Sequence, residues 1–184
     1  MQSQNQPNLG SPICGILIIA ILSGFFGSYA YNPPNPVNCF AGPDSTLISP
    51  VKTDLQPKNV TAEFHSFFQW MFVLYMIQLV VHCIQVLGAI TKNASLFMCG
   101  YRILAIVGCT YFAVIITGTV YRFRNEGRVC SGEFEPTILE QPYVLEKEGQ
   151  FIKVWTILFY SLFGCICCCA CLFVVVAMKG ARGH

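Results

Sequence analysis

Four long apolar runs constrain this chain more than any other feature of its sequence. They cover residues 13–31, 67–90, 96–121 and 154–178. Each is close to or above the roughly 20 residues that a helix needs to cross the hydrocarbon layer of a bilayer. Backbone amides and carbonyls in lipid must be paired within their own segment, so these runs predict helices. We therefore expect an all-α membrane protein, with residues 1–184 forming one four-helix membrane domain.

The composition also indicates a membrane protein and argues against several other classes. Hydrophobic residues make up 54% of the chain and charged residues 11%, and the mean hydropathy is +0.57. Soluble domains carry roughly 25% charged residues. The net charge is only +2, without a basic cluster interleaved with aromatic residues, so nucleic acid is not an expected partner. P-loop, G-x-S-x-G and H-E-x-x-H motifs are absent, so we expect no enzymatic activity and no cofactor.

The charges between the apolar runs predict the orientation. All nine acidic residues lie in residues 32–66 and 122–153, which also hold seven Lys or Arg residues. The opposite side has Lys92, Arg102, Lys179 and Arg182 and no acidic residue. By the positive-inside rule we expect both termini in the cytosol, and residues 32–66 and 122–153 as two extracytosolic loops. The membrane is the plasma membrane or an endomembrane.

Each predicted outer loop carries one cysteine, Cys39 in the first and Cys130 in the second. In an oxidising compartment these two would pair, contributing ~2–4 kcal/mol to stability, and the alternative is two free thiols. Asn59-Val60-Thr61 is a glycosylation sequon in the first loop. A second sequon at Asn93 lies in the short turn on the other side, so the disulfide argument favours glycosylation at Asn59.

The fourth run contains a cluster of five cysteines between Cys165 and Cys171. Cys165 lies ~16 Å beyond Val154 along a helix, near the middle of the bilayer, where low polarity keeps a thiol protonated and unreactive. No His, Asp or Glu joins the cluster, so no metal site is expected. We expect Cys165 and Cys168 to serve as small packing residues. Cys14 and Cys99 lie near the cytosolic interface and are the candidates for acylation.

Polar residues inside the apolar runs are few. Gln78, His82 and Gln85 follow the spacing i, i+4, i+7 and so share one helix face. They would either line a polar path or hydrogen-bond to Tyr111, Thr110 or Thr117 of another helix, and we favour the structural role. Arg102 is close enough to the cytosolic end of its run to extend its guanidinium to the surface.

Small residues recur every four positions along the first run, at Ala20, Gly24 and Ser28. This stripe is suited to close helix contact, either within the bundle or with another subunit.

The layout of four spans, cytosolic termini, a short inner turn and two outer loops resembles the tetraspan membrane proteins. The claudin motif W…G-L-W-C-C and the tetraspanin motif Cys-Cys-Gly are missing. The chain is most similar to MARVEL-like proteins, with "FHSFFQWMFVLYMIQ" entering the second run and "YRFRNEGRVCSG" leaving the third. That resemblance implies a non-catalytic role in membrane organisation, trafficking or assembly.

Three functions follow as hypotheses. The first is a scaffold or accessory subunit that contacts lipids, other membrane proteins or copies of itself. The second is a channel or transporter component that uses Gln78, His82 and Gln85. The third is a membrane thiol oxidoreductase, because vitamin K epoxide reductases resemble this chain in having four spans and a C-x-x-C in the last one. That family also needs a pair of shuttle cysteines in its first loop, where Cys39 stands alone.

Overall fold

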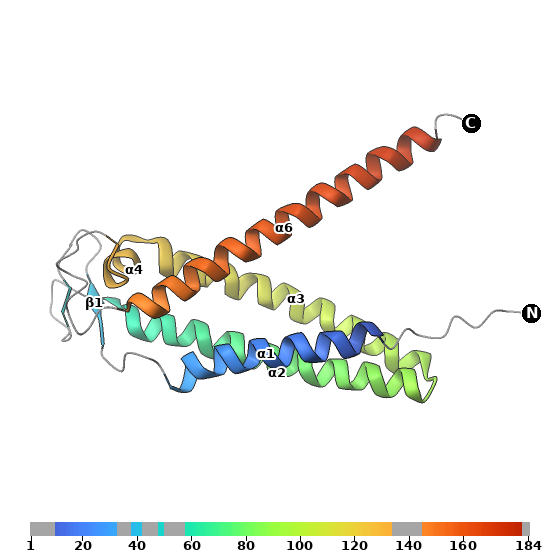
Figure 1. The fold of residues 1–184 in the computed structure, drawn as a ribbon, viewed down its shortest axis with the longest axis horizontal. Helices are drawn as coiled ribbons and strands as arrows, with labels where there is room; N and C mark the ends of the chain where they lie inside the picture. Colours follow the sequence, from blue (N-terminus) through green and yellow to red (C-terminus); the bar gives the residue numbers. More distant parts are fainter. Residues whose placement is uncertain (1–9, 33–37, 42–47, 50–57, 134–144, 182–184) are drawn as a thin grey trace, which may run out of the picture.

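The computed structural model describes residues 10–32, 38–41, 48–49, 58–133 and 145–181. Within these ranges, four helices are long and apolar enough to cross a membrane. They are α1 (Gly10–Tyr31), α2 (Val60–Ile90), α3 (Ala94–Phe123) and α6 (Glu146–Ala181), and Figure 1 shows how they are arranged. A short helix, α4 (Asn125–Cys130), follows α3. Three two-residue strands complete the described elements: β1 (Phe40–Ala41), β2 (Ile48–Ser49) and β3 (Lys58–Asn59).

The elements that connect the long helices are gathered at one end of the molecule. The strands form an antiparallel sheet in the order β2-β1-β3, with Phe40 opposite both Ser49 and Asn59. The sheet lies beside α4 at the same end, while α1 begins near the α2–α3 turn at the other end, and α6 runs toward that side but diverges from the other helices (Figure 1). We call the end with the sheet and α4 the outer end, and the other the inner end.

The turn between α2 and α3 is short because the two helices approach closely. Lys92 adopts φ 52°, which allows the chain to reverse, and the Asn93 amide donates to the Gly88 carbonyl at 2.9 Å. A Cβ atom at Gly88 would lie 2.8 Å from the backbone nitrogen of Phe97. Glycine at this position therefore lets the backbones of the two helices meet.

An aromatic cluster at the outer half joins α1, α2 and α6. Phe26 of α1 is fully buried, and its ring centroid lies 5.3 Å from Tyr75 of α2 and 5.1 Å from Trp155 of α6. Phe68 and Phe151 complete the contact, at 6.1 and 5.2 Å from Phe26. Aromatic rings at these separations are favourable beyond their simple burial, so this cluster holds the outer half of α6 against the bundle.

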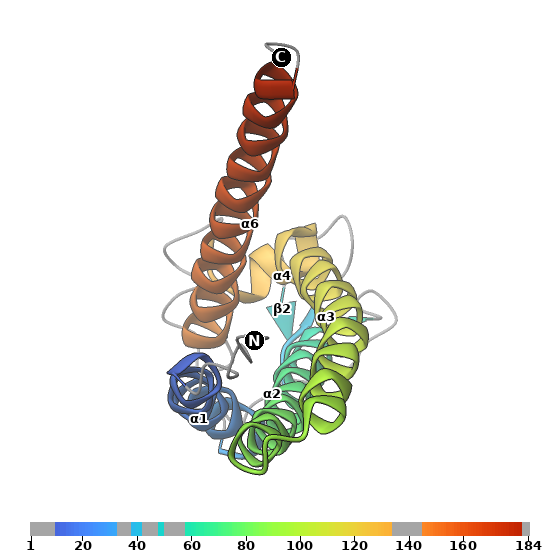
Figure 2. The ribbon, with the colours of Figure 1, turned by 90° about the vertical axis from the view of Figure 1, so that its right-hand side faces the viewer.

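The inner half of α6 leaves the bundle. Its last ring contacts with α3 are those of Phe159 and Phe163 with Phe112, at 6.1 and 5.5 Å. All side chains from 161 to 169 are exposed, and Figures 1 and 2 show α6 diverging from α1 and α3 toward its C-terminal end. The described part of the chain therefore forms a closed outer half and an open inner half.

The helices match the four predicted runs and extend beyond them. α2 begins at Val60 rather than 67, and α6 at Glu146 rather than 154. The expected 32–66 loop is therefore shorter and contains a small sheet that the hydropathy pattern did not predict. The extensions occur because the first two turns of each helix pack on the outer-end elements, and Val60 and Ile152 in these turns are fully buried.

Replacing Gly88 with Ala should destabilise the protein by about 1–3 kcal/mol, because its new methyl group would meet the α3 backbone. The matched control is Gly108→Ala, since nothing lies within 4 Å of a Cβ built at Gly108. The control should leave the thermal midpoint in detergent unchanged or slightly higher. Equal midpoints for the two variants would contradict the close helix approach.

Candidate functional site

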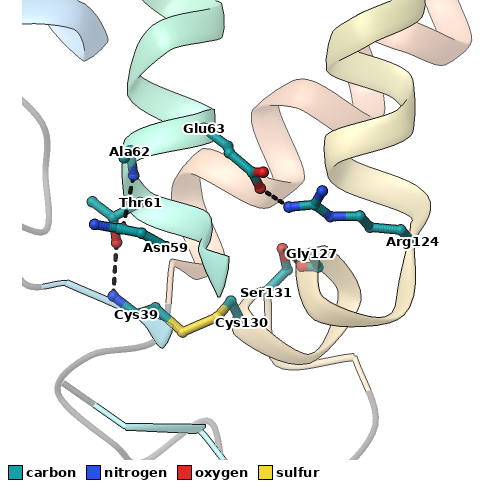
Figure 3. Close-up of a disulfide and its surroundings, with 9 residues drawn as sticks. All are labelled: Cys39, Asn59, Thr61, Ala62, Glu63, Arg124, Gly127, Cys130 and Ser131. Carbon is teal, nitrogen blue, oxygen red and sulfur yellow. Dashed lines mark hydrogen bonds and ion pairs between the residues drawn. A yellow bond between two sulfur atoms is a disulfide. The ribbon is translucent and has the colours of Figure 1, made fainter. Parts of the chain in front are cut away.

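The outer end is held together by a disulfide between Cys39 and Cys130, the pair that the sequence analysis predicted. Their Cα atoms lie 6.1 Å apart, they are separated by 91 residues, and both are fully buried (Figure 3). The Cys39 amide donates to the Thr61 hydroxyl at 2.7 Å, and the Leu145 amide donates to the Cys130 carbonyl at 2.7 Å. The bridge therefore links the residue before β1 to the last residue of α4, at a point that also contacts the start of α2 and the residue before α6.

A second connection at the outer end is an ion cluster around Glu133. Arg122 is fully buried, and its guanidinium donates to the Gly149 carbonyl and to the Glu133 carboxylate, both at 2.7 Å. Lys153 and Arg128 donate to the same carboxylate at 2.8 and 3.1 Å. The hydrogen bond from Arg122, with those from Lys153 and Arg128, lowers the pKa of Glu133 to about 2. Glu133 therefore ties the end of α3 to α4 and α6.

A third connection joins α2 to the end of α3. Arg124 follows directly after α3 and forms an ion pair with Glu63 in the first turn of α2, as Figure 3 shows. Sequence reasoning treated these Arg and Glu residues only as loop charges. The sequence signal that could have indicated these ion pairs is the position of Arg122 and Arg124 directly after an apolar run, together with acidic residues in both predicted outer loops.

Both sequons have a structural role as helix N-caps. The Asn59 side chain accepts a hydrogen bond from the Ala62 amide at 3.0 Å at the start of α2. The Asn93 side chain accepts from the Ser95 and Leu96 amides, both at 3.1 Å, at the start of α3. Asn is among the preferred capping residues, so the capping accounts for Asn at both positions. Glycosylation of Asn59 stays a prediction.

The polar residues of α2 are divided between two environments. His82 Nδ1 donates to Gln85 Oε1 at 2.8 Å, because an amide oxygen only accepts. Gln85 is 2% exposed and packs on Gly100 of α3, whereas His82 packs on Gly15 of α1. Gln78 instead lines a separate cavity.

The expected cross-helix partners of these residues are engaged elsewhere. Thr110 and Thr117 donate to carbonyls of their own helix, Ile106 and Ala113, and the Tyr111 hydroxyl bonds to that of Tyr75 at 2.8 Å. Arg102 is exposed on α3, and the snorkelling of its side chain stays a prediction.

The predicted packing residues face away from the rest of this chain. Ala20, Gly24 and Ser28 are exposed, and a Cβ at Gly24 would meet nothing within 4 Å. α1 packs on the bundle with another face, which includes Ile19, Ser23 and Phe26. Any helix contact that the small stripe makes therefore lies outside this chain.

The cysteines of α6 have the same outward placement. Cys165 and Cys168 are exposed, as are the acylation candidates Cys14 and Cys99. Cys171 has a side chain outside the described part. Among the described residues, no group of three or more His, Cys, Asp or Glu could hold a metal ion. Packing through Cys165 and Cys168 would therefore require a neighbour other than this chain's own helices.

A lateral cleft with a volume of about 440 Å³ extends from Tyr75 and Trp155, at the edge of the aromatic cluster, into the open inner half. Its lining residues come from all four long helices. Its walls are mostly apolar, and the polar groups among its lining residues belong to Gln78, Trp155 and the hydroxyl-bonded pair Tyr75 and Tyr111. The lining residues are Ile19, Leu22, Tyr75, Gln78, Tyr111, Trp155, Leu158, Phe159, Leu162, Phe163 and Ile166.

Comparison with known proteins found no matching family model, no matching curated protein and no matching solved structure. The four apolar helices fit a tetraspan layout.

Glu133→Gln should lower the free energy of unfolding by about 3 kcal/mol, because it leaves the buried Arg122 without its carboxylate. The control Glu146→Gln changes an exposed acid in the first turn of α6 and should cost about 0.5 kcal/mol.

The ion cluster also predicts a pH dependence. The lowered pKa of Glu133 means that its stabilising effect is present above pH 4.5 and is lost as the pH falls toward about 2. Thermal midpoints measured in detergent across this range should fall more in the wild type than in Glu133→Gln. Parallel pH profiles would contradict the ion cluster.

Proposed function

We propose that this protein is a non-catalytic subunit or scaffold of a larger membrane assembly, which it joins through lateral helix and loop contacts. Both termini lie in the cytosol in this proposal, with the outer end in an oxidising compartment. The role is the one that the resemblance to MARVEL-like proteins implies.

The observation that carries this proposal is the divergence of α6. Residues 161–169 of this helix are exposed, including the large side chains Leu162, Phe163 and Ile166. The divergence also opens the lateral cleft, in which Gln78 presents an amide among apolar walls. Polar groups inside a membrane protein usually face partners or cavities rather than lipid, so a neighbouring helix is a favourable occupant of this side.

The outward small residues add to this support. The Ala20, Gly24 and Ser28 stripe on α1 and the cysteines of α6 are exposed to the surroundings of the chain. Small side chains allow two helix backbones to approach closely in a membrane, where packing rather than water exclusion drives association.

The two other hypotheses have less support. A polar path would need Gln78, His82 and Gln85 to line one channel, whereas His82 and Gln85 bond to each other and Gln78 lines the cleft. A reductase of the vitamin K epoxide type would need free shuttle thiols in the first loop, whereas Cys39 is joined to Cys130.

The test is extraction from the native membrane in a mild detergent, followed by native mass measurement. We expect the chain to be recovered with other polypeptides, at a mass well above its own 20.5 kDa. Recovery as a single chain with detergent and lipid alone, across several mild detergents, would contradict the proposal.

A matched pair of photoreactive substitutions locates the contact. Ile166 lines the lateral cleft and is 67% exposed, whereas Ile106 lies on α3 outside the cleft and is 70% exposed. A photoreactive residue at Ile166 should form an adduct with a protein that also co-purifies with the chain. The same residue at Ile106 should form adducts with lipid.

A further inference from the structure

Gln78 is the polar side chain of the lateral cleft that has no partner within the described part of the chain. It lies on α2 and lines the cleft, and its side-chain amide makes no hydrogen bond to another described residue. The other polar groups of the lining are engaged or covered. The Tyr75 and Tyr111 hydroxyls bond to each other at 2.8 Å, and the indole nitrogen of Trp155 is buried. The Gln78 amide is therefore the polar group that an occupant of the cleft meets.

The position of Gln78 along its helix places this amide near the middle of the second apolar run. The run covers residues 67–90, so Gln78 lies 11 residues after its start and 12 before its end. At 1.5 Å per residue, each distance is about 17 Å, and the hydrocarbon layer is roughly 30 Å thick. The polar groups of lipids lie at the edges of that layer, so acyl chains at this depth offer the amide no hydrogen bond. An unpaired amide in apolar surroundings is unfavourable, which favours an occupant with its own polar group.

The α6 wall of the cleft has the form of a helix-packing surface. Leu158, Leu162 and Ile166 line it at a spacing of four residues and are 51, 64 and 67% exposed. Side chains four residues apart form a ridge that fits a groove on the surface of a second helix. The row is about 12 Å long, which corresponds to roughly two turns of a facing helix. A row of this length suits a helix better than a small molecule.

The volume of the cleft limits how such a helix can enter. A helix with its side chains is about 10–12 Å wide and rises 1.5 Å per residue, so a volume of about 440 Å³ corresponds to roughly three residues of helix. A whole helix therefore does not fit inside the cleft. A helix that lies across its opening, against the ridge on α6, can place one or two side chains inside.

A second copy of this chain does not supply a side chain that matches the Gln78 amide. The other amides in the four apolar runs are Gln69, near the outer end of its run, and Gln85, which is 2% exposed and accepts a hydrogen bond within its own helix. The Thr110 and Thr117 hydroxyls donate to carbonyls of their own helix. They can accept a hydrogen bond from an amide but are not free to donate one.

We propose that the lateral cleft recognises a membrane-crossing helix of a different polypeptide through an Asn or Gln side chain near the middle of that helix. This inference rests on the proposed assembly role and names the chemistry of the partner. A side-chain amide both donates and accepts, so it can form two hydrogen bonds with the Gln78 amide at once. Gln78 thus selects among membrane helices, while the ridge on α6 provides the packing surface.

The experiment uses the purified full chain in phosphatidylcholine vesicles and synthetic transmembrane peptides as probes. Each peptide is a run of about 20 Leu and Ala residues with Lys at both ends. One peptide carries Gln at the centre of the run, one carries Leu there, and one carries Gln at the end of the run. Energy transfer from a donor on the chain to an acceptor on the peptide measures binding, at densities where the peptides do not associate with each other. We expect the central-Gln peptide to bind about three- to tenfold more tightly than the other two.

Two variants and a matched control test the location. Gln78→Met keeps the length of the side chain but removes its hydrogen-bonding groups, and should make the three peptides bind equally. Ile166→Ala shortens the ridge and should weaken the binding of all three peptides alike. The control Thr117→Val removes an exposed hydroxyl of α3 outside the cleft lining and should preserve the preference for central Gln.

Three results would overturn the proposal. The first is equal binding of all peptides by the wild-type chain, or a preference that persists in folded Gln78→Met. The second is energy transfer between labelled copies of the chain that is lost in Gln78→Met, because the cleft would then belong to a second copy. The third is a small molecule retained by the wild type in native mass spectrometry and lost from Gln78→Met, without a peptide preference. Recovery of the native chain with other polypeptides is measured independently, so failure of the amide contact leaves the assembly role standing.

Discussion

The Cys39–Cys130 disulfide is the constraint on which the outer end depends. It joins two segments that are 91 residues apart, one before α2 and one after α3. Around it, the sheet, α4 and the first turns of α2 and α6 are brought to one place, and the buried Arg122 finds both Glu133 and the Gly149 carbonyl. A buried guanidinium is costly unless it is paired, so this arrangement requires Glu133 and the start of α6 to stay against the end of α3.

The position of these connections explains the contrast between the two halves of the molecule. Arg122, Glu133 and the Phe26 aromatic cluster all hold α6 near its beginning. Farther along α6, the described ring contacts with α3 end at Phe163. The residues that follow, 164–169, are exposed. A closed outer half with an open inner half leaves a lateral surface of the described helices exposed, and this surface is the basis of the proposed role in assembly.

Much of the fold could be predicted from local sequence, and much of the site could not. Runs of apolar residues predicted the long helices, because hydrogen bonding in lipid leaves few alternatives. The pairing of Cys39 with Cys130 followed from the predicted topology.

The Glu133 cluster was missed because loop charges carry no periodic signal. The spacing of Gln78, His82 and Gln85 predicted that they share a helix face, but it could not show that His82 packs on α1 and Gln85 on α3. The helix N-caps at Asn59 and Asn93 could have been predicted from the sequence, since Asn is a preferred N-cap residue.

The most direct measurement is peptide mapping of protein taken from its native membrane, alkylated without reduction and then digested. The account predicts a linked peptide pair that joins Cys39 to Cys130, with exposed cysteines such as Cys165 carrying the alkyl group after denaturation. Alkylation of Cys39 or Cys130 in the unreduced protein would contradict the account, because the outer end would then lack the bond that holds its segments together.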